Sequence, residues 1–190
     1  DLVSAYRKGK GKTGEVVLSV SGLNGGGLNK ISFKLHRGEI FGIAGLVGSS
    51  RTELLRMLYG VEPIDGGKIV VNGNPFKPRS PRDSIRRDIV YVPEERRTQG
   101  LVLDRSVSEN ITLVYLKRLS SGFFLNRKLE KEEAERAGIS VKLKATSLEQ
   151  PVKTLSGGNQ QKVVFAKCLL CKPLVLMLDE PTRGVDIGAR

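Results

Sequence analysis

A glycine- and serine-rich loop between an apolar run and a helical pattern constrains the fold of this chain more than any other feature. Ile40–Ala44 is an apolar run typical of a buried strand, and a helical leucine pattern from Leu54 to Leu58 stops at Gly60. We expect the loop between them to bind phosphate through Gly45, Leu46, Val47, Gly48, Ser49, Ser50, Arg51 and Thr52. Small residues let successive N–H groups turn toward anionic oxygens, so the order predicts an α/β fold with a phosphate-binding loop.

This loop departs at two positions from the usual pattern, in which glycine, lysine and then a hydroxyl residue close the loop. Ser50 replaces the glycine and Arg51 the lysine, while Thr52 keeps the hydroxyl that can bind magnesium. Arg51 retains the positive charge, but its planar guanidinium differs in reach from an ammonium group. Taken alone, the loop is equally consistent with an ordinary strand-to-helix turn in which a serine caps the helix.

A second apolar run ends in two carboxylates. Leu174–Leu178 is continuously apolar, as expected of a strand buried on both faces, and Asp179 and Glu180 follow it directly. At the end of such a strand, Asp179 can hold magnesium together with Thr52, and Glu180 can orient an attacking water, the usual division of labour in phosphoryl transfer. The alternative is that two acids simply end a strand.

A third segment has few counterparts outside one family. It consists of Leu155, Ser156, Gly157, Gly158, Asn159 and Gln160, followed by a second glutamine. Ser156 can cap a helix that begins near Gly158, and the two glycines allow the backbone at the positive helix end to approach a phosphate closely. An unrelated capped helix start is the alternative. The segment resembles the signature sequence of ABC ATPases.

The motifs together resemble those of one branch of the ABC transporter ATPases, the C-terminal nucleotide-binding half of bacterial ribose- and galactose-type monosaccharide importers. The resemblance covers the chain from about Val16 and rests on Ser50–Thr52, Val92–Glu94, Leu155–Lys162 and Asp179–Asp186. It implies an α/β fold: a P-loop NTPase core with an antiparallel β flank and a helical subdomain. It also implies that the C-terminal part of the domain, with a central strand and a phosphate-sensing histidine, is absent from a chain that stops at Arg190.

In that family two ATP molecules, with Mg²⁺, lie between two halves, each held by the phosphate loop of one half and the signature of the other. The signature here would therefore contact the partner's nucleotide. Glu94 stands where most members have a glutamine that meets the metal and the membrane partner, which makes it a second candidate catalytic acid beside Glu180. A carboxylate there adds negative charge and cannot donate a hydrogen bond when ionised. The alternative is a surface acid beside Arg96 and Arg97.

The expected organisation is a linker at 1–15 and an incomplete ABC ATPase domain at 16–190, with a helical subdomain at about 100–165. Alternation of apolar residues predicts strands at Val16–Val20 and Ile31–Leu35, and helical spacing recurs in Arg127–Ala137 and Asn159–Leu170. Gly184–Asp186 matches the loop through which the two halves touch.

Three departures predict weak or altered nucleotide binding and hydrolysis that works best at the partner's site. The phosphate loop is altered, Ser21–Lys30 contains no aromatic residue to stack on adenine, and the sole histidine, His36, precedes the loop. We expect the chain by itself to be a weak or inactive ATPase.

Composition leaves rival classes open. Lysine and arginine outnumber the acids 32 to 20, a net charge of +12 that suits phosphates, nucleic acid or an anionic membrane. A nucleic-acid-associated ABC ATPase is disfavoured because few aromatic residues intersperse the basic ones and no long heptad insertion is present. A non-catalytic regulatory half remains an alternative, while a metabolic P-loop kinase leaves the signature unexplained. Cys168 and Cys171 lie in an apolar helical stretch and indicate two buried thiols.

The implied partners are the N-terminal ATPase half of the same polypeptide, membrane permease subunits and, indirectly, a sugar-binding protein, with no nucleic acid. The implied location is peripheral, on the cytoplasmic face of the plasma (inner) membrane. No run approaches the 18 or more apolar residues that a membrane helix needs.

Overall fold

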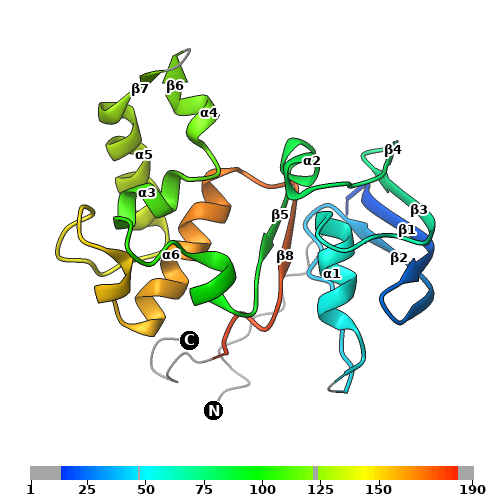
Figure 1. Cartoon of the computed structure of the whole chain (residues 1–190). Helices are drawn as coiled ribbons and strands as arrows, with labels where there is room; N and C mark the ends of the chain where they lie inside the picture. The colour runs from blue at the N-terminus through cyan, green and yellow to red at the C-terminus, as the bar shows by residue number, and fades with distance from the viewer. Residues whose placement is uncertain (1–13, 47, 122–123, 184–190) are drawn as a thin grey trace. The chain divides into compact units, whose positions relative to one another are not determined.

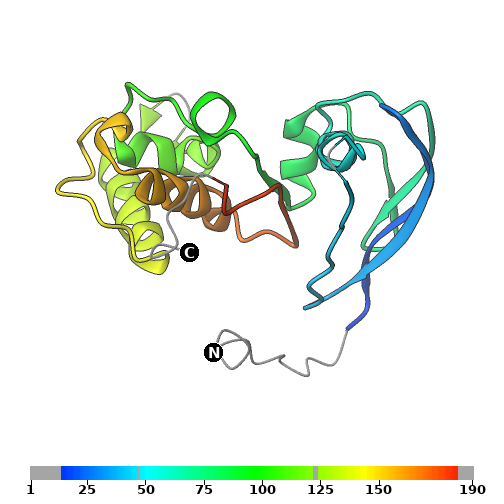
Figure 2. The ribbon, with the colours of Figure 1, turned by 90° about the horizontal axis from the view of Figure 1, so that it is seen from below.

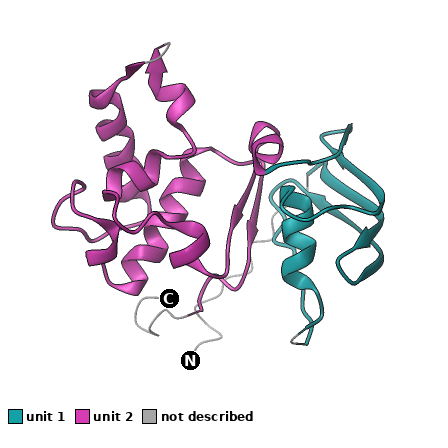
Figure 3. Ribbon diagram, viewed as in Figure 1, with its two compact units in different colours: residues 1–80 teal, residues 81–190 magenta. Residues whose placement is uncertain are grey.

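The computed structural model describes residues 14–46, 48–121 and 124–183, so that the predicted linker lies almost wholly outside the described residues. The chain divides into two compact units, residues 1–80 and 81–190 (Figure 3). The phosphate loop, Gly45–Thr52, belongs to the first unit, and the two carboxylates and the signature belong to the second. Each unit is described by itself.

The first unit contains an antiparallel sheet with the strand order β2-β1-β3-β4 (Figure 1). Its strands are β1 (Val16–Gly25), β2 (Leu28–His36), β3 (Gly66–Val71) and β4 (Asn74–Phe76). Leu18 pairs with Leu35 of β2 on one side and with Val71 of β3 on the other. This sheet confirms the antiparallel flank, although β1 and β2 are longer than the sequence pattern predicts because pairing continues into the glycine-rich turn.

Helix α1 (Arg51–Tyr59) completes the first unit and ends where the sequence predicts. Gly60 adopts the left-handed conformation, with φ 81°, and its N–H donates to the carbonyl oxygens of Arg56 and Met57. A Cβ at Gly60 would lie 2.7 Å from the carbonyl oxygen of Ser80, so both the backbone angle and the space require glycine.

The apolar run Ile40–Ala44 does not form the predicted strand. No residue in the described part of the chain forms a β-ladder with it, and the Ile40 side chain is 100% exposed. The phenyl ring of Phe41 stacks on that of Phe33, with centroids 5.2 Å apart. A strand is stabilised by hydrogen bonds to a neighbour, so an apolar run without such a neighbour does not form one.

The second unit is built on two parallel strands and a group of helices. The strands are β5 (Ile89–Val92) and β8 (Val175–Leu178), paired so that Val92 lies opposite Leu178. The other elements are α2 (Pro81–Arg86), the π-helix η2 (Arg96–Gly100), α3 (Val107–Thr112), α4 (Leu116–Leu119), β6 (Ser120–Ser121), β7 (Phe124–Leu125), α5 (Arg127–Ser140), the 3₁₀ turn η3 (Val152–Thr154) and α6 (Gly157–Leu170). None of the helices in the described residues is long and apolar enough to cross a membrane.

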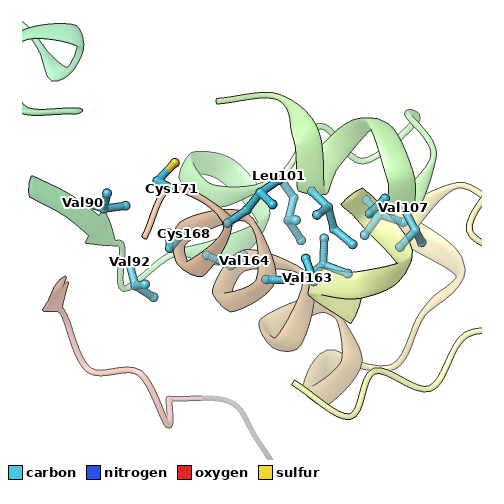
Figure 4. Close-up of a cluster of buried hydrophobic side chains, with 14 of the residues drawn as sticks. Val90, Val92, Leu101, Val107, Val163, Val164, Cys168 and Cys171 are labelled. Atoms are coloured by element: carbon cyan, nitrogen blue, oxygen red, sulfur yellow. The ribbon is translucent and has the colours of Figure 1, made fainter. Parts of the chain in front are cut away.

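Helix α6 lies between the β5–β8 pair and helices α3 and α5 (Figures 1 and 2). Its Val163 and Val164 belong to one buried cluster with Val90 and Val92 of β5 and with residues of the surrounding helices (Figure 4). Burying these aliphatic side chains supplies the main stabilising free energy of the unit.

The two strands differ in burial. All four residues of β5 are buried, as expected of a strand covered on both faces. Along β8 the residues alternate, and Leu178 is 42% exposed, so the prediction of burial on both faces is wrong for this strand. Within the described residues β8 pairs only with β5, so one of its edges has no hydrogen-bonded neighbour there. Its alternating burial means that one face is covered less than the other.

Two buried cysteines and a buried lysine lie at the carboxyl-terminal end of α6. Both cysteines are buried, which confirms the interpretation as thiols of the core, and burial raises the pKa of the Cys168 thiol to about 12. The buried Lys167 ammonium donates to the carbonyl oxygen of Gly100, the last residue of η2, and burial lowers its pKa. A lysine on α6 thus fixes the end of the segment that follows β5.

Candidate functional site

The phosphate loop forms a tight turn before α1. The N–H of Ser49 donates to the carbonyl oxygen of Leu46 at 3.1 Å, and a Cβ at Gly45 would lie 2.2 Å from Ser49 Oγ. A larger residue at position 45 would therefore require the Ser49 side chain to move. Val47, one of the predicted phosphate-binding residues, lies outside the described residues.

Ser50, which replaces the usual glycine, takes the backbone conformation that glycine favours. Its φ and ψ are 57° and 30°, in the left-handed region, and its side chain accepts no capping hydrogen bond from α1. The alternative of a serine-capped turn therefore lacks the hydrogen bond that defines it. A residue with a Cβ is strained in this conformation, so the substitution costs the loop conformational energy.

The ends of β5 and β8 form a second site, which we call the carboxylate edge, where Asp179 and Glu180 leave β8. Asp179 is only 4% exposed, and its backbone N–H donates to the carbonyl oxygen of Val92 at 3.0 Å. The Tyr91 hydroxyl donates to Asp179 Oδ2 at 2.8 Å. One hydrogen bond to strand β5 thus fixes the Asp179 backbone, and a second, donated by Tyr91, restrains its buried carboxylate. The sequence analysis missed Tyr91, although its place near the end of β5 was a usable signal.

Glu180 differs from its neighbour in both exposure and backbone conformation. Glu180 is exposed, and its φ is 40°, in the left-handed region that residues with a Cβ rarely adopt. The N–H of Arg183 donates to the carbonyl oxygen of Glu180 at 3.0 Å, closing a turn directly after the strand. The chain therefore turns a second carboxylate out to solvent immediately after a buried one.

Glu94 follows β5 and is held by Arg183 from the segment after β8. Glu94 Oε1 contacts Arg183 Nη1, and Glu95 Oε1 lies 3.4 Å from the same nitrogen. Arg96 Nη1 donates to the carbonyl oxygen of Arg183 at 3.1 Å. The ion pair adds Arg183 to the surroundings of Glu94, and the choice between a catalytic and a surface acid stays a prediction.

The signature segment has the predicted cap. Helix α6 begins at Gly157, and the Ser156 hydroxyl accepts from the N–H of Asn159 at 3.4 Å and from its side-chain amide at 3.1 Å. Leu155 and Gln160 point inward, and Gln160 Nε2 donates to the carbonyl oxygen of Leu155 at 3.2 Å. The inward residues anchor the segment, which leaves Ser156 and the two glycines as the part available to a ligand.

Magnesium requires oxygen ligands, and the predicted ligands supply them. Within the described ranges no three or more histidine, cysteine or acidic residues gather in a group that could hold a metal. Mg²⁺ is usually held by one or two protein oxygens together with phosphate and water, so a threonine hydroxyl and an aspartate suit it. Thr52 and Asp179 belong to different units, and their pairing stays a prediction. Gly184–Asp186 lies outside the described residues.

Comparison with known proteins agrees with this combination of fold and motifs. The family model for ABC transporters matches residues 28–183. An ATP-binding cassette of an ABC transporter superposes with a TM-score of 0.76 at 21% identity, covering 92% of this chain and 73% of the cassette. A dimeric cassette bound to ADP and phosphate gives a TM-score of 0.75 at 18% identity, with 90% and 77% covered. The chain belongs to the ABC transporter ATPases and has their P-loop NTPase fold.

The sequence relatives are more specific. The chain is 45% identical over 186 residues to the ribose import ATP-binding protein RbsA of Bacillus cereus, which covers 97% of this chain and 38% of the relative. It is 42% identical over 190 residues to a putative ribose/galactose/methyl galactoside import ATP-binding protein of Rhizobium etli, covering 100% and 36%. The chain thus spans little more than a third of the length of these relatives.

Proposed function

We propose that this chain is an ATP-binding and ATP-hydrolysing half of an ABC importer that energises monosaccharide uptake. The observation that carries the proposal is the carboxylate edge, where a buried, doubly hydrogen-bonded Asp179 is followed by an exposed Glu180. Phosphoryl transfer needs one fixed carboxylate for the metal and one accessible carboxylate for water. The names of the relatives support sugar uptake as the process.

In this mechanism Thr52 and Asp179 would hold the magnesium ion, and the Tyr91 hydroxyl restrains the Asp179 carboxylate. Bound with ATP, the metal supplies positive charge that polarises the phosphates. N–H groups of the phosphate loop and the Arg51 guanidinium orient the phosphate oxygens, while Glu180 holds the attacking water. Arg51 and the strained Ser50 support the proposal that this loop binds nucleotide less tightly than an unaltered loop does.

The signature would serve a nucleotide held by the other half. Ser156 already accepts hydrogen bonds from the first turn of α6, so the glycine backbone and the positive helix end are preorganised toward an anion. A preserved signature beside an altered phosphate loop supports hydrolysis chiefly at the partner's site. The same difference also supports a second candidate, a half that binds nucleotide and regulates its partner without turnover.

The proposed partners follow from the same resemblance. They are an N-terminal ATPase half, membrane permease subunits that contact the region after Glu94 and the helical elements, and a sugar-binding protein reached only through the permease. The proposed location is the cytoplasmic face of the plasma (inner) membrane, bound as a peripheral subunit.

Equilibrium binding of a fluorescent ATP analogue with magnesium tests the proposed site. Thr52→Ala and Asp179→Ala should each weaken binding by at least about tenfold because each removes a metal ligand. Glu132→Ala is a matched control because it removes an exposed carboxylate from α5. A folded wild-type chain that binds no analogue would reject the site, and binding without hydrolysis would favour the regulatory half.

A further inference from the structure

Two segments leave the carboxyl ends of neighbouring parallel strands, and one arginine joins them. Val92 lies opposite Leu178, and Asp179 hydrogen-bonds to the carbonyl oxygen of Val92, so the segments after β5 and β8 start side by side. Glu94 lies two residues beyond the end of β5. Glu94 thus follows the strand end that lies beside the proposed metal ligand Asp179, and its carboxylate contacts Arg183 from the segment after Asp179.

Arg183, in the segment after β8, contacts the segment after β5 through its side chain and through its backbone. Arg183 Nη1 contacts Glu94 Oε1 and lies 3.4 Å from Glu95 Oε1. The carbonyl oxygen of Arg183 accepts from Arg96 Nη1 at 3.1 Å. The Glu94 side chain is 27% exposed and that of Arg183 54%, so water screens the pair only in part. A planar guanidinium is suited to hold two carboxylates at once.

A carboxylate that is paired with a guanidinium binds a small divalent cation less well, because the two positive groups compete for the same oxygens. Mg²⁺ in addition requires its ligands in near-octahedral geometry. A third acid beside Asp179 and Glu180 would also raise like-charge repulsion unless a cation neutralised it. Arg183 supplies that neutralising charge.

We propose that Arg183 is a positioning residue, which holds the Glu94 carboxylate in an ion pair and so keeps it out of the coordination of the divalent cation that Asp179 binds. The inference rests on the proposed function, and it adds that the affinity for the cation is set by a residue that does not touch the cation. Glu94, a candidate catalytic acid by sequence, then acts as the partner of Arg183 in the described state.

A double-mutant cycle with Mn²⁺ as the probe tests this inference without measuring turnover. The affinity for Mn²⁺ is measured from the electron paramagnetic resonance of free Mn²⁺, at saturating non-hydrolysable ATP analogue. Arg183→Ala should release Glu94 and tighten Mn²⁺ binding by roughly three- to tenfold, the size of coupling expected between groups in contact. Glu94→Gln alone should change the affinity by less than about twofold, and the double variant should return close to wild type.

Two controls and one replacement variant separate this result from other effects. Arg97→Ala removes an exposed arginine three residues beyond Glu94, so a general effect of lost positive charge would appear there as well. Glu95→Gln removes the second, more distant carboxylate and should leave the effect of Arg183→Ala in place. Arg183→Gln keeps the length of the side chain and replaces Arg183→Ala if the alanine variant does not fold, as judged by circular dichroism.

Two results would overturn the inference. One is an Arg183→Ala variant that binds Mn²⁺ as wild type does, or that binds it more tightly whether residue 94 is Glu or Gln. The other is a Glu94→Gln variant that weakens binding while Arg183 is present, which would make Glu94 a ligand. If instead wild type and Asp179→Ala both fail to bind Mn²⁺, the proposed function fails and this inference fails with it.

Discussion

Residues 40–50 and residues 89–94 share one sequence pattern, an apolar run followed by a polar segment. The two segments nevertheless adopt different structures. The first run is open, with Ile40 fully exposed, and its loop ends in the strained Ser50. The second run is β5, buried throughout and hydrogen-bonded to β8. An apolar run becomes a buried strand only where a neighbour satisfies its backbone groups. The carboxylate edge is therefore positioned by hydrogen bonds between strands of its own unit. The phosphate loop is positioned mainly by its own turn.

The largest expected effect is on the rate of hydrolysis, and it should distinguish the carboxylate edge from the phosphate loop. In the protein that contains both ATPase halves, Glu180→Gln should lower single-turnover hydrolysis at the site of this half by roughly 10²- to 10⁴-fold, because a positioned acid or base contributes that much. It should leave nucleotide affinity nearly unchanged, whereas Arg51→Lys should change affinity more than the rate. Quench-flow hydrolysis and equilibrium binding of the two variants measure both quantities. An equal loss of hydrolysis rate in the two variants would contradict the assignment of hydrolysis to the carboxylate edge and of binding to the phosphate loop.

A matched pair of isoleucines tests the structural contrast. Ile89 is 1% exposed and Ile40 is 100% exposed. Ile89→Ala should lower the free energy of unfolding of the second unit by about 2–5 kcal/mol, because it leaves a cavity in a packed core. Ile40→Ala should change the free energy of unfolding of the first unit, to which Ile40 belongs, by less than about 0.5 kcal/mol. Urea denaturation of both variants measures the difference, and a large loss in Ile40→Ala would mean that the run is buried in solution.

The hydroxyl of Tyr91 should have a smaller effect. Tyr91→Phe removes the donor to Asp179 and should lower the free energy of unfolding by about 1 kcal/mol, the usual net value of one hydrogen bond. It should also weaken magnesium-dependent nucleotide binding, because the Asp179 carboxylate loses a restraint. Tyr115→Phe is the control, since Tyr115 lies under Arg118 rather than beside a carboxylate. If the two substitutions weaken binding equally, Tyr91 does not position Asp179.

Relief of strain in the phosphate loop should give the smallest effect and one of opposite sign. Ser50→Gly should stabilise the first unit by roughly 0.5–1 kcal/mol, because glycine adopts the left-handed conformation without a Cβ clash but costs more entropy. Ser49→Gly, one residue earlier and without a positive φ, should not stabilise it. Thermal denaturation distinguishes the two. Destabilisation by Ser50→Gly would mean that the loop takes another conformation in solution.

Local signals in the sequence were sufficient for some elements. Gly60 ends α1 and Ser156 caps α6, as predicted, because caps depend on residues three or four positions away. The family resemblance added the fold class, which periodicity alone does not distinguish from other α/β folds.

The contacts at the carboxylate edge could not be predicted in this way. Tyr91 and Asp179 are 88 positions apart and meet only because β5 and β8 pair in one particular register. The Arg183–Glu94 pair depends on the same register and on the turn after Glu180. The open state of Ile40–Ala44 depends on a missing hydrogen-bonding neighbour in the described residues, and an apolar run carries no information about its neighbours.

Helix α6 has one further consequence, which arises from its continuity. It begins with the signature glycines, and Lys167, near its other end, donates to the carbonyl oxygen of Gly100. The helix has 14 residues, which corresponds to a length of about 21 Å. One helix therefore carries both the capping contact next to Ser156 and the lysine that holds the end of η2, so the two contacts share a single continuous backbone.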